Sequence, residues 1–115
     1  MQEIDRVAVI IRPCEPMLAW INHLPDPEFK DLILEDIYQD CTVLLLPLCE
    51  DEDELRHLLE KNYMNLFTNE LAAWCEDESL WPSHLNFNLF KQWFDVEPHS
   101  LVIDLGEEEK APLYN

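Results

Sequence analysis

Apolar positions along the chain predict three β-strands. Residues 6–12 carry apolar side chains at every position from Val7 to Ile11, so both sides of the run are apolar and we predict a strand buried on both faces. Residues 42–46 form an uninterrupted apolar run that is also typical of a central strand. Residues 100–105 alternate and predict a third strand in the interior of a sheet.

Apolar residues that recur three and four positions apart predict helices between these strands. Residues 15–24 fit a short helix with a proline in its first turn and further prolines after its end. Residues 28–38 fit either a helix or an extended segment. Near the C-terminus, Asn86 is a candidate N-cap for a short helix in which Phe87, Phe90, Trp93 and Phe94 fall at helical spacing.

The strongest helical pattern follows the second strand. Either Asp51 or Asp53 can cap this helix, and the acidic residues of its first turn suit the positive end of the helix dipole. Polar residues that favour caps and turns weaken its middle, so we expect a break into two segments near Phe67. The apolar stripe consists of Leu55, Leu58, Leu59, Leu66, Leu71 and Trp74.

Alternation of strands and helices indicates an α+β fold. Helical connections between strands commonly place those strands in parallel, so we predict helices packed in two layers on a three- or four-stranded mixed or parallel sheet. At 115 residues the chain suits a single domain, over residues 1–106, followed by an acidic tail over residues 107–115.

Composition adds that this domain has a strongly anionic surface. The chain has 25 acidic and 7 basic residues, a net charge of -18, yet 48% of its residues are hydrophobic. That apolar content predicts a folded core, whereas the charge argues against direct binding to nucleic acid or to an anionic membrane. The apolar runs are too short to span a bilayer, and the acidic residues 1–5 do not resemble a signal peptide, so we expect a cytoplasmic protein.

Cysteine and glycine usage excludes several kinds of site. The four cysteines form no Cys-x-x-Cys pair, so we expect free thiols and no zinc motif. Phosphate-binding loops, dinucleotide-binding folds and EF-hands need glycine where the backbone turns sharply, and this chain has a single glycine, Gly106. We therefore expect no cofactor.

The densest polar constellation is Asp95, Glu97 and His99. In an extended segment Glu97 and His99 project to one face, and a carboxylate beside an imidazole can bind a metal or act in acid/base catalysis. A metal site needs three or four protein ligands, and the sequence does not show where further ligands lie. Structural hydrogen bonding is the alternative, and any catalytic residue stays unknown at this level.

Acidic clusters favour a role in protein interaction. We predict a non-enzymatic module that binds a basic protein surface, with patches formed by Glu50, Asp51, Glu52, Asp53, Glu54, Glu76, Asp77 and Glu78. Trp81 precedes a proline in a loop and is a candidate apolar anchor. The alternatives are a small metal-dependent or acid/base enzyme, a nucleic-acid mimic, and a subunit whose charge only prevents self-association. The partner and the oligomeric state stay open.

The C-terminal segment also carries a resemblance. Trp93, Phe94, Asp95, Val96, Glu97, His99, Ser100 and Asp104 form a Trp-Phe-Asp-Val-Glu-x-His-Ser segment followed by a strand with an aspartate. This segment resembles a family of small bacterial proteins of unassigned function, and the acidic residues 50–54 and the Leu80-Trp81-Pro82 piece are similar too. The resemblance covers most of the chain. It implies a bacterial cytosolic protein and transfers no catalytic residue.

Overall fold

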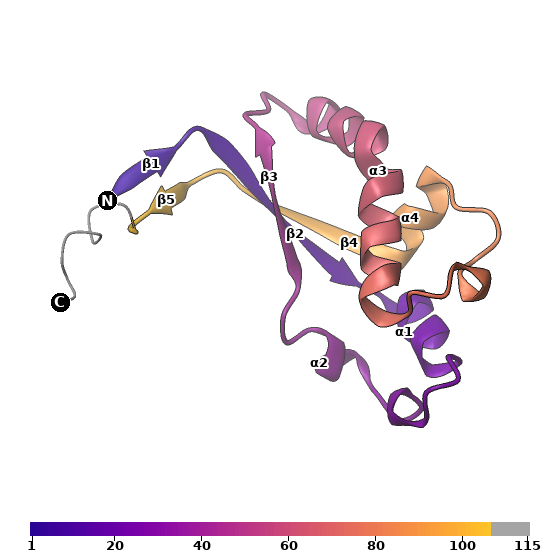
Figure 1. The fold of residues 1–115 in the computed structure, drawn as a ribbon. Helices are drawn as coiled ribbons and strands as arrows, with labels where there is room; N and C mark the ends of the chain where they lie inside the picture. Colours follow the sequence, from indigo (N-terminus) through magenta and orange to yellow (C-terminus); the bar gives the residue numbers. More distant parts are fainter. Residues whose placement is uncertain (107–115) are drawn as a thin grey trace, which may run out of the picture.

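The computed structural model describes residues 1–106, and the predicted acidic tail lies outside the described residues. Helices and strands share this region (Figure 1), which confirms the α+β class. The strands are β1 (Gln2–Ile4), β2 (Arg6–Pro13), β3 (Thr42–Pro47), β4 (Phe94–His99) and β5 (Val102–Asp104). The helical elements are α1 (Glu15–Asn22), η1 (Pro27–Phe29), α2 (Leu34–Ile37), α3 (Glu52–Trp74), η2 (Glu78–Leu80) and α4 (Phe87–Trp93).

The main sheet has the order β3-β2-β4, and both of its strand pairs are antiparallel. The prediction of a parallel or mixed sheet is therefore wrong. The helical segment between β2 and β3 lies beyond the end of the sheet and does not cross its face (Figure 1). The chain consequently re-enters the sheet at the end where it left, so β3 must run back along β2.

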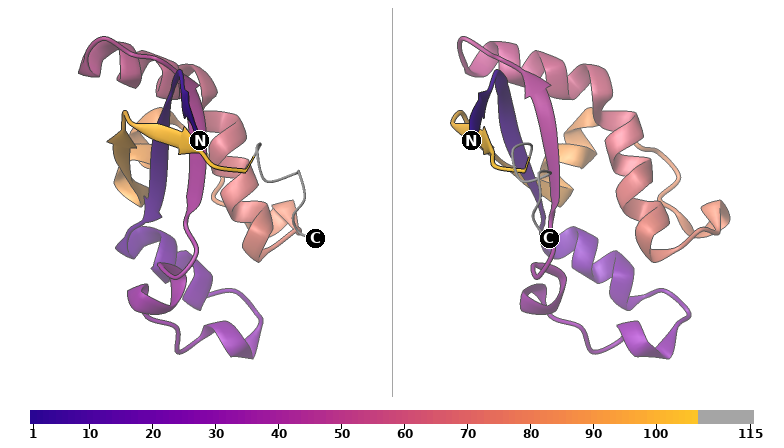
Figure 2. Two further views of the ribbon diagram at one scale, coloured as in Figure 1. Left: turned by 90° about the vertical axis from the view of Figure 1, so that its left-hand side faces the viewer. Right: turned by 60° about the vertical axis from the view of Figure 1, so that its left-hand side comes forward.

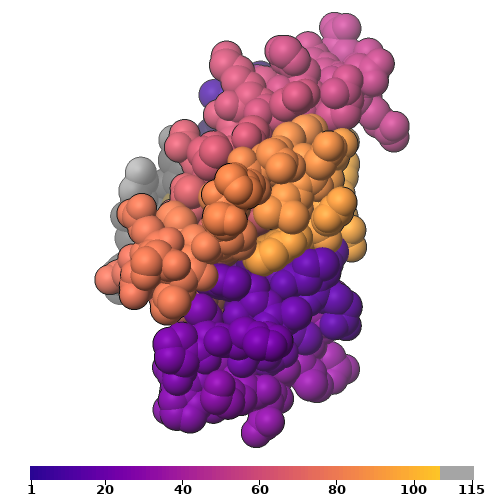
Figure 3. Space-filling view, turned by 90° about the vertical axis from the view of Figure 1, so that its right-hand side faces the viewer, coloured from indigo at the N-terminus to yellow at the C-terminus, as the bar shows by residue number. Residues whose placement is uncertain are grey.

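Only one face of the main sheet is buried. Val7, Val9 and Ile11 are at most 6% exposed, whereas Ala8 and Ile10 between them are partly exposed. Two views around the sheet show α3 and α4 on one side of it (Figure 2), and the view onto the helical side shows these segments packed against one another (Figure 3). The predicted burial of both faces is thus wrong. The core comprises Val7, Val9, Ile11, Met17, Leu18, Ile21, Ile37, Phe67, Leu71, Phe90 and Phe94.

β3 lies at an edge of the sheet and not in its centre. Leu44 and Leu46 stand opposite Val9 and Val7 and are half-buried. On the other face Val43 and Leu45 are 57% and 58% exposed. The prediction of a central strand is wrong because the centre is taken by β2, which has β3 on one side and β4, from the far end of the chain, on the other.

β1 and β5 form a two-stranded arm that projects from the body (Figure 1). Ala8 stands opposite His99 and Ile4 opposite Val102. Between these two pairs the N-terminal segment therefore has one residue more than the C-terminal segment. An extra residue of this kind increases the local twist and bends a ribbon away from its sheet. The third strand is therefore not interior, and its apolar residues Leu101, Ile103 and Leu105 are exposed.

The helices follow the sequence patterns more closely. α1 begins at Glu15 as predicted, whereas the ambiguous residues 28–38 hold only the end of η1 and the single turn of α2. α4 is capped by Asn86, whose side chain accepts a hydrogen bond from the Leu89 N–H at 2.8 Å. No helix within residues 1–106 is both long enough and apolar enough to cross a membrane.

α3 is one helix of 23 residues, so the predicted break near Phe67 is wrong. The Thr68 hydroxyl bonds back to the Met64 carbonyl at 2.9 Å, which satisfies the polar side chain within the helix. Phe67 itself is fully buried among Phe90, Trp93 and Phe94, with ring centroids 5.5 to 5.8 Å away. Burial of this ring outweighs the weak helix propensity of its neighbours.

Candidate functional site

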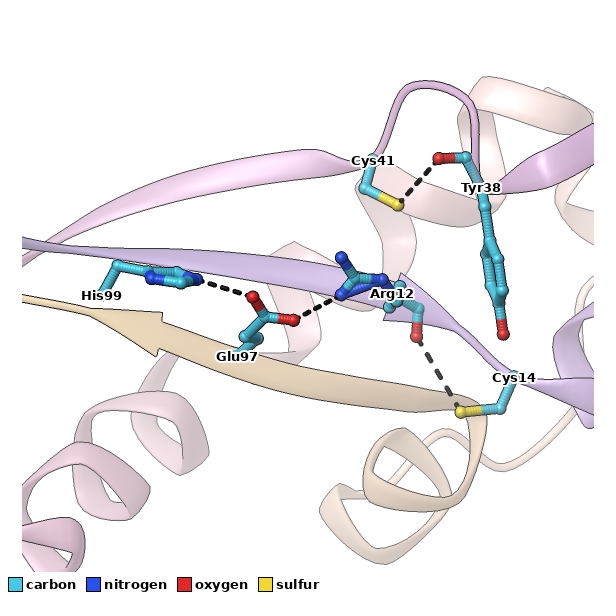
Figure 4. A network of polar contacts seen from close by, with 6 residues as sticks. All are labelled: Arg12, Cys14, Tyr38, Cys41, Glu97 and His99. Atoms are coloured by element: carbon cyan, nitrogen blue, oxygen red, sulfur yellow. Dashed lines mark hydrogen bonds and ion pairs between the residues drawn. The ribbon is translucent and has the colours of Figure 1, made fainter. Parts of the chain in front are cut away.

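Glu97 and His99 do lie side by side on the open face of the sheet, as their spacing predicts. His99 Nε2 is 2.6 Å from Glu97 Oε2, and Arg12 Nη1 is 2.6 Å from Glu97 Oε1 (Figure 4). Arg12 reaches this cluster from β2, and the sequence does not indicate it because the pairing of β2 with β4 joins residues 85 positions apart. Both carboxylate oxygens of Glu97 are thereby occupied.

The electrostatics of this cluster are those of an ion-pair network. The hydrogen bond from His99, followed by the charge of Arg12, lowers the pKa of Glu97 below its ordinary value of 4.5. Asp95 lies opposite Arg12 in the β2–β4 register. The pKa of the Cys14 thiol is raised mainly by burial and secondly by the charge of Asp95. Within residues 1–106 no three His, Cys, Asp or Glu side chains gather as metal ligands do. The cluster ties β4 to β2.

The acidic residues 50–54 form the exposed N-terminus of α3. Asp51 is the N-cap, as one of the two predicted alternatives states, and its carboxylate accepts a hydrogen bond from the Glu54 N–H at 2.9 Å. The Glu54 carboxylate in turn accepts one from the Glu50 N–H at 2.7 Å. This reciprocal capping holds the acidic segment in a fixed shape while its other carboxylates face solvent.

An apolar groove adjoins this acidic segment, between the first half of α3 and the α4–β4 turn. Its volume is about 400 Å³, within the usual range of binding clefts. A second cleft of about 320 Å³ continues it past Cys49, Glu50, Asp51 and Pro98. The groove is lined by Glu52, Leu55, Arg56, Leu59, Phe87, Phe90, Lys91, Phe94, Asp95, Val96 and Pro98.

Charges around this groove are mixed, with an acidic excess on one side. Arg56 is paired with Glu60 at 3.5 Å, and the Lys91 ammonium lies 5.0 Å from the centre of the Phe87 ring. Glu52 belongs to both clefts and leads into the acidic residues 50–54. The residues of the groove lie in separate segments of the sequence. The groove exists only where α3 packs beside α4 and β4, so sequence patterns do not predict it.

The second predicted acidic patch lies at the other end of α3. Glu76, Asp77 and Glu78 are exposed, and Asp77 accepts hydrogen bonds from the N–H and the hydroxyl of Ser79, which lower the pKa of Asp77. Trp81 is half-buried against the core, and its indole N–H donates to the Cys75 carbonyl at 2.8 Å. The structure therefore does not bring the two acidic patches together.

The cysteines are free, as expected from their spacing. All four are half-buried. Burial is the main effect that raises the pKa of the Cys14, Cys41 and Cys49 thiols. Raised thiol pKa values disfavour the nucleophilic thiolate, so these positions do not have the environment of an activated cysteine.

Glu70 on α3 is a carboxyl group that sequence reasoning missed. It accepts a hydrogen bond from the Thr42 hydroxyl and lines a small cleft beside Asp40 and Trp74. Burial raises the pKa of Glu70 above its ordinary value of 4.5, although the Thr42 hydrogen bond acts in the opposite direction. The folded state therefore loses stability as the pH rises from 4.5 through this raised pKa.

Replacing Glu70 with Gln should consequently stabilise the protein at pH 7, because an amide keeps an acceptor for Thr42 without burying a charge. The gain should disappear below the ordinary pKa, where both states carry a neutral carboxyl group. Urea unfolding at several pH values measures the difference. Glu60→Gln, an exposed change on the same helix, should leave the free energy of unfolding within about 0.5 kcal/mol. A loss of stability in Glu70→Gln at pH 7 would contradict this assignment.

Comparisons with protein-family models, with curated proteins and with solved structures found no match.

Proposed function

We propose that the protein is a non-enzymatic interaction module that binds a basic segment of a partner protein in the apolar groove between α3 and the α4–β4 turn. One observation carries this proposal: Glu50, Asp51 and Glu52 line the cleft that continues a groove whose lining includes leucine and phenylalanine side chains. A partner segment with both basic and apolar side chains complements such a surface.

The two parts of this surface have different physical roles. Carboxylates at the mouth attract a cationic segment over several ångströms and raise the rate of association, an effect that salt weakens. Apolar side chains that enter the groove supply most of the affinity, because they lose contact with water there. Trp81 is less suited to this role than we predicted, since its indole is already half-buried and hydrogen-bonded to Cys75.

Binding of a synthetic peptide tests the proposal. The probe is an amphipathic helix with lysines on one face and leucines on the other, compared with a peptide in which glutamates replace the lysines. We expect the lysine peptide to bind at low salt and to weaken as salt is added, and the glutamate peptide not to bind. The double change Glu52→Lys with Asp53→Lys should slow association about tenfold or more.

A matched control uses the other acidic patch. Glu76→Lys with Glu78→Lys changes the net charge by the same amount at the opposite end of α3 and should leave the peptide affinity nearly unchanged. Equal losses in both double variants would show that bulk charge and not this groove attracts the peptide. Binding of the two peptides with equal affinity would also contradict the proposal.

A further inference from the structure

The outer edge of β3 combines two properties that do not fit a monomer. The strand is apolar on both faces, a pattern that belongs to the interior of a sheet. Yet it has no partner on its outer side within residues 1–106, and Val43 and Leu45 are more than half exposed. Edge strands usually carry charges, prolines or bulges that prevent further pairing, and in β3 only the terminal Pro47 serves this purpose.

A groove of about 360 Å³ runs along this edge, between β3 and α3. Its lining is formed by six leucines and two asparagines, all of them uncharged, in a chain with 25 acidic residues. Side chains from an added strand would enter this groove at alternate positions. The lining residues are Leu44, Leu45, Leu46, Leu58, Leu59, Asn62, Asn65 and Leu66.

We propose that β3 pairs with β3 of a second copy of this chain, in antiparallel orientation about a two-fold axis perpendicular to the sheet. The product is a continuous six-stranded sheet of order β4-β2-β3-β3-β2-β4, with the helices of both copies on one side. β3 then has a hydrogen-bonded neighbour on each side, so the position in the centre of a sheet that its sequence predicts is restored, and Val43 and Leu45 gain cross-strand contacts on the open face. Each copy places alternate apolar side chains in the other's groove.

The register of this pairing is restricted by geometry. Residues directly opposite each other in an antiparallel pair lie on the same face. A two-fold axis through Leu44 therefore places Val43 of one copy opposite Leu45 of the other on the open face, and a second such pair is related by symmetry. An axis through Leu45 also preserves the faces. Registers shifted by one residue would place exposed side chains opposite core side chains and are excluded.

Charge favours a second copy as the occupant of this edge. Two chains of net charge -18 repel each other over most of their surfaces, whereas residues 42–48 and the groove lining bear no charge. A basic partner gains nothing from this uncharged edge, whereas the groove between α3 and the α4–β4 turn adjoins the acidic residues Glu50, Asp51 and Glu52. Self-pairing is thus independent of the proposed binding of a basic segment. Salt distinguishes the two, because it weakens binding of a basic segment and strengthens association of like-charged chains.

Sedimentation or light scattering over a concentration series tests the inference. The measured mass should rise from 13.7 kDa toward twice that value between about 10 µM and about 1 mM. The dimer dissociation constant should fall several-fold when salt is raised from about 0.05 M to about 0.5 M. A mass that stays at 13.7 kDa throughout would overturn the proposal.

Paired charge variants then locate the contact. Val43→Glu with Leu45→Glu places like charges opposite each other across the two-fold axis and should abolish the dimer, and Val43→Lys with Leu45→Lys should do the same. An equal mixture of these two variants should form a heterodimer, since in either register position 45 of one variant then faces a side chain of opposite charge. This rescue shows that both variants still fold.

A control variant, Met64→Glu with Leu80→Glu, adds the same charge at two other exposed apolar positions and should dimerise as the wild type does. Two results would overturn the assignment of the contact to β3. One is an unchanged dimer in either β3 variant, and the other is a mixture that stays monomeric although the wild type dimerises.

Discussion

Replacing Phe67 with Ala should destabilise the folded state by about 3 to 5 kcal/mol. Phe67 is fully buried and meets Phe90, Trp93 and Phe94 at edge-on angles of 60° to 89°, so one truncation removes contacts to both α4 and β4. Native proteins have only about 5 to 15 kcal/mol of net stability. The loss should appear as a fall of roughly 15 °C in the unfolding midpoint, measured by circular dichroism.

Met64→Ala is the matched control for this prediction. Met64 lies three residues earlier on α3 and is 43% exposed, so its truncation removes little buried area and should change stability by less than about 1 kcal/mol. A small effect of Phe67→Ala would contradict the arrangement of α3 against α4 and β4. A large effect of Met64→Ala would mean that another part of the protein, or a second copy, covers this position.

Phe67 also shows what local patterns predict and what they do not. Helix propensity suggests a break near this residue, because Asn65, Thr68 and Asn69 are weak helix formers. The structure keeps the helix intact, since the aromatic residues of α4 and β4 form a pocket for the ring. Caps and first turns are set by contacts within a few residues, and there the prediction of Asn86 is confirmed, as is Asp51, one of the two predicted alternatives for α3.

Strand positions were harder to predict because pairing depends on distant residues. An apolar pattern shows that β3 needs cover on both faces, but it does not show whether that cover comes from this chain. The predicted central position is wrong for the isolated chain, and the proposed dimer would provide the missing neighbour. The sequence pattern also does not show that β2 and β3 are antiparallel, since their direction depends on where α1 lies relative to the end of the sheet.

The candidate site shows the same limit. Strand periodicity correctly places Glu97 and His99 on one face, where they form a hydrogen bond. Arg12 completes that cluster through the β2–β4 pairing, and no local signal connects it to Glu97. The groove beside residues 50–54 likewise depends on the packing of α3 against α4. Acidic composition indicates a basic partner, whereas only the packing shows where apolar side chains of that partner find a place.

Adjacent residues of β2 provide the sharpest test of which face is buried. Val9→Lys should unfold the protein or cost at least about 4 kcal/mol, because Val9 is fully buried in the core and a lysine there has no partner for its charge. Ile10→Lys should cost less than about 1 kcal/mol, because Ile10 lies on the open face, opposite Glu97. Urea unfolding of both variants at low micromolar concentration, where the proposed dimer is dissociated, measures the contrast.

The Ile10 variant separates two explanations of an apolar β2. Equal destabilisation of the two variants at low concentration would mean that one chain already covers both faces, contrary to the structure. If Ile10→Lys is harmless at low concentration, the apolar residues of the open face are not required for folding of the single chain. Ile10 stands opposite Val43, so its apolar character then serves the same side of the sheet as the proposed Val43 and Leu45 contacts. On that basis the buried face of β2 is the one on which folding of the single chain depends.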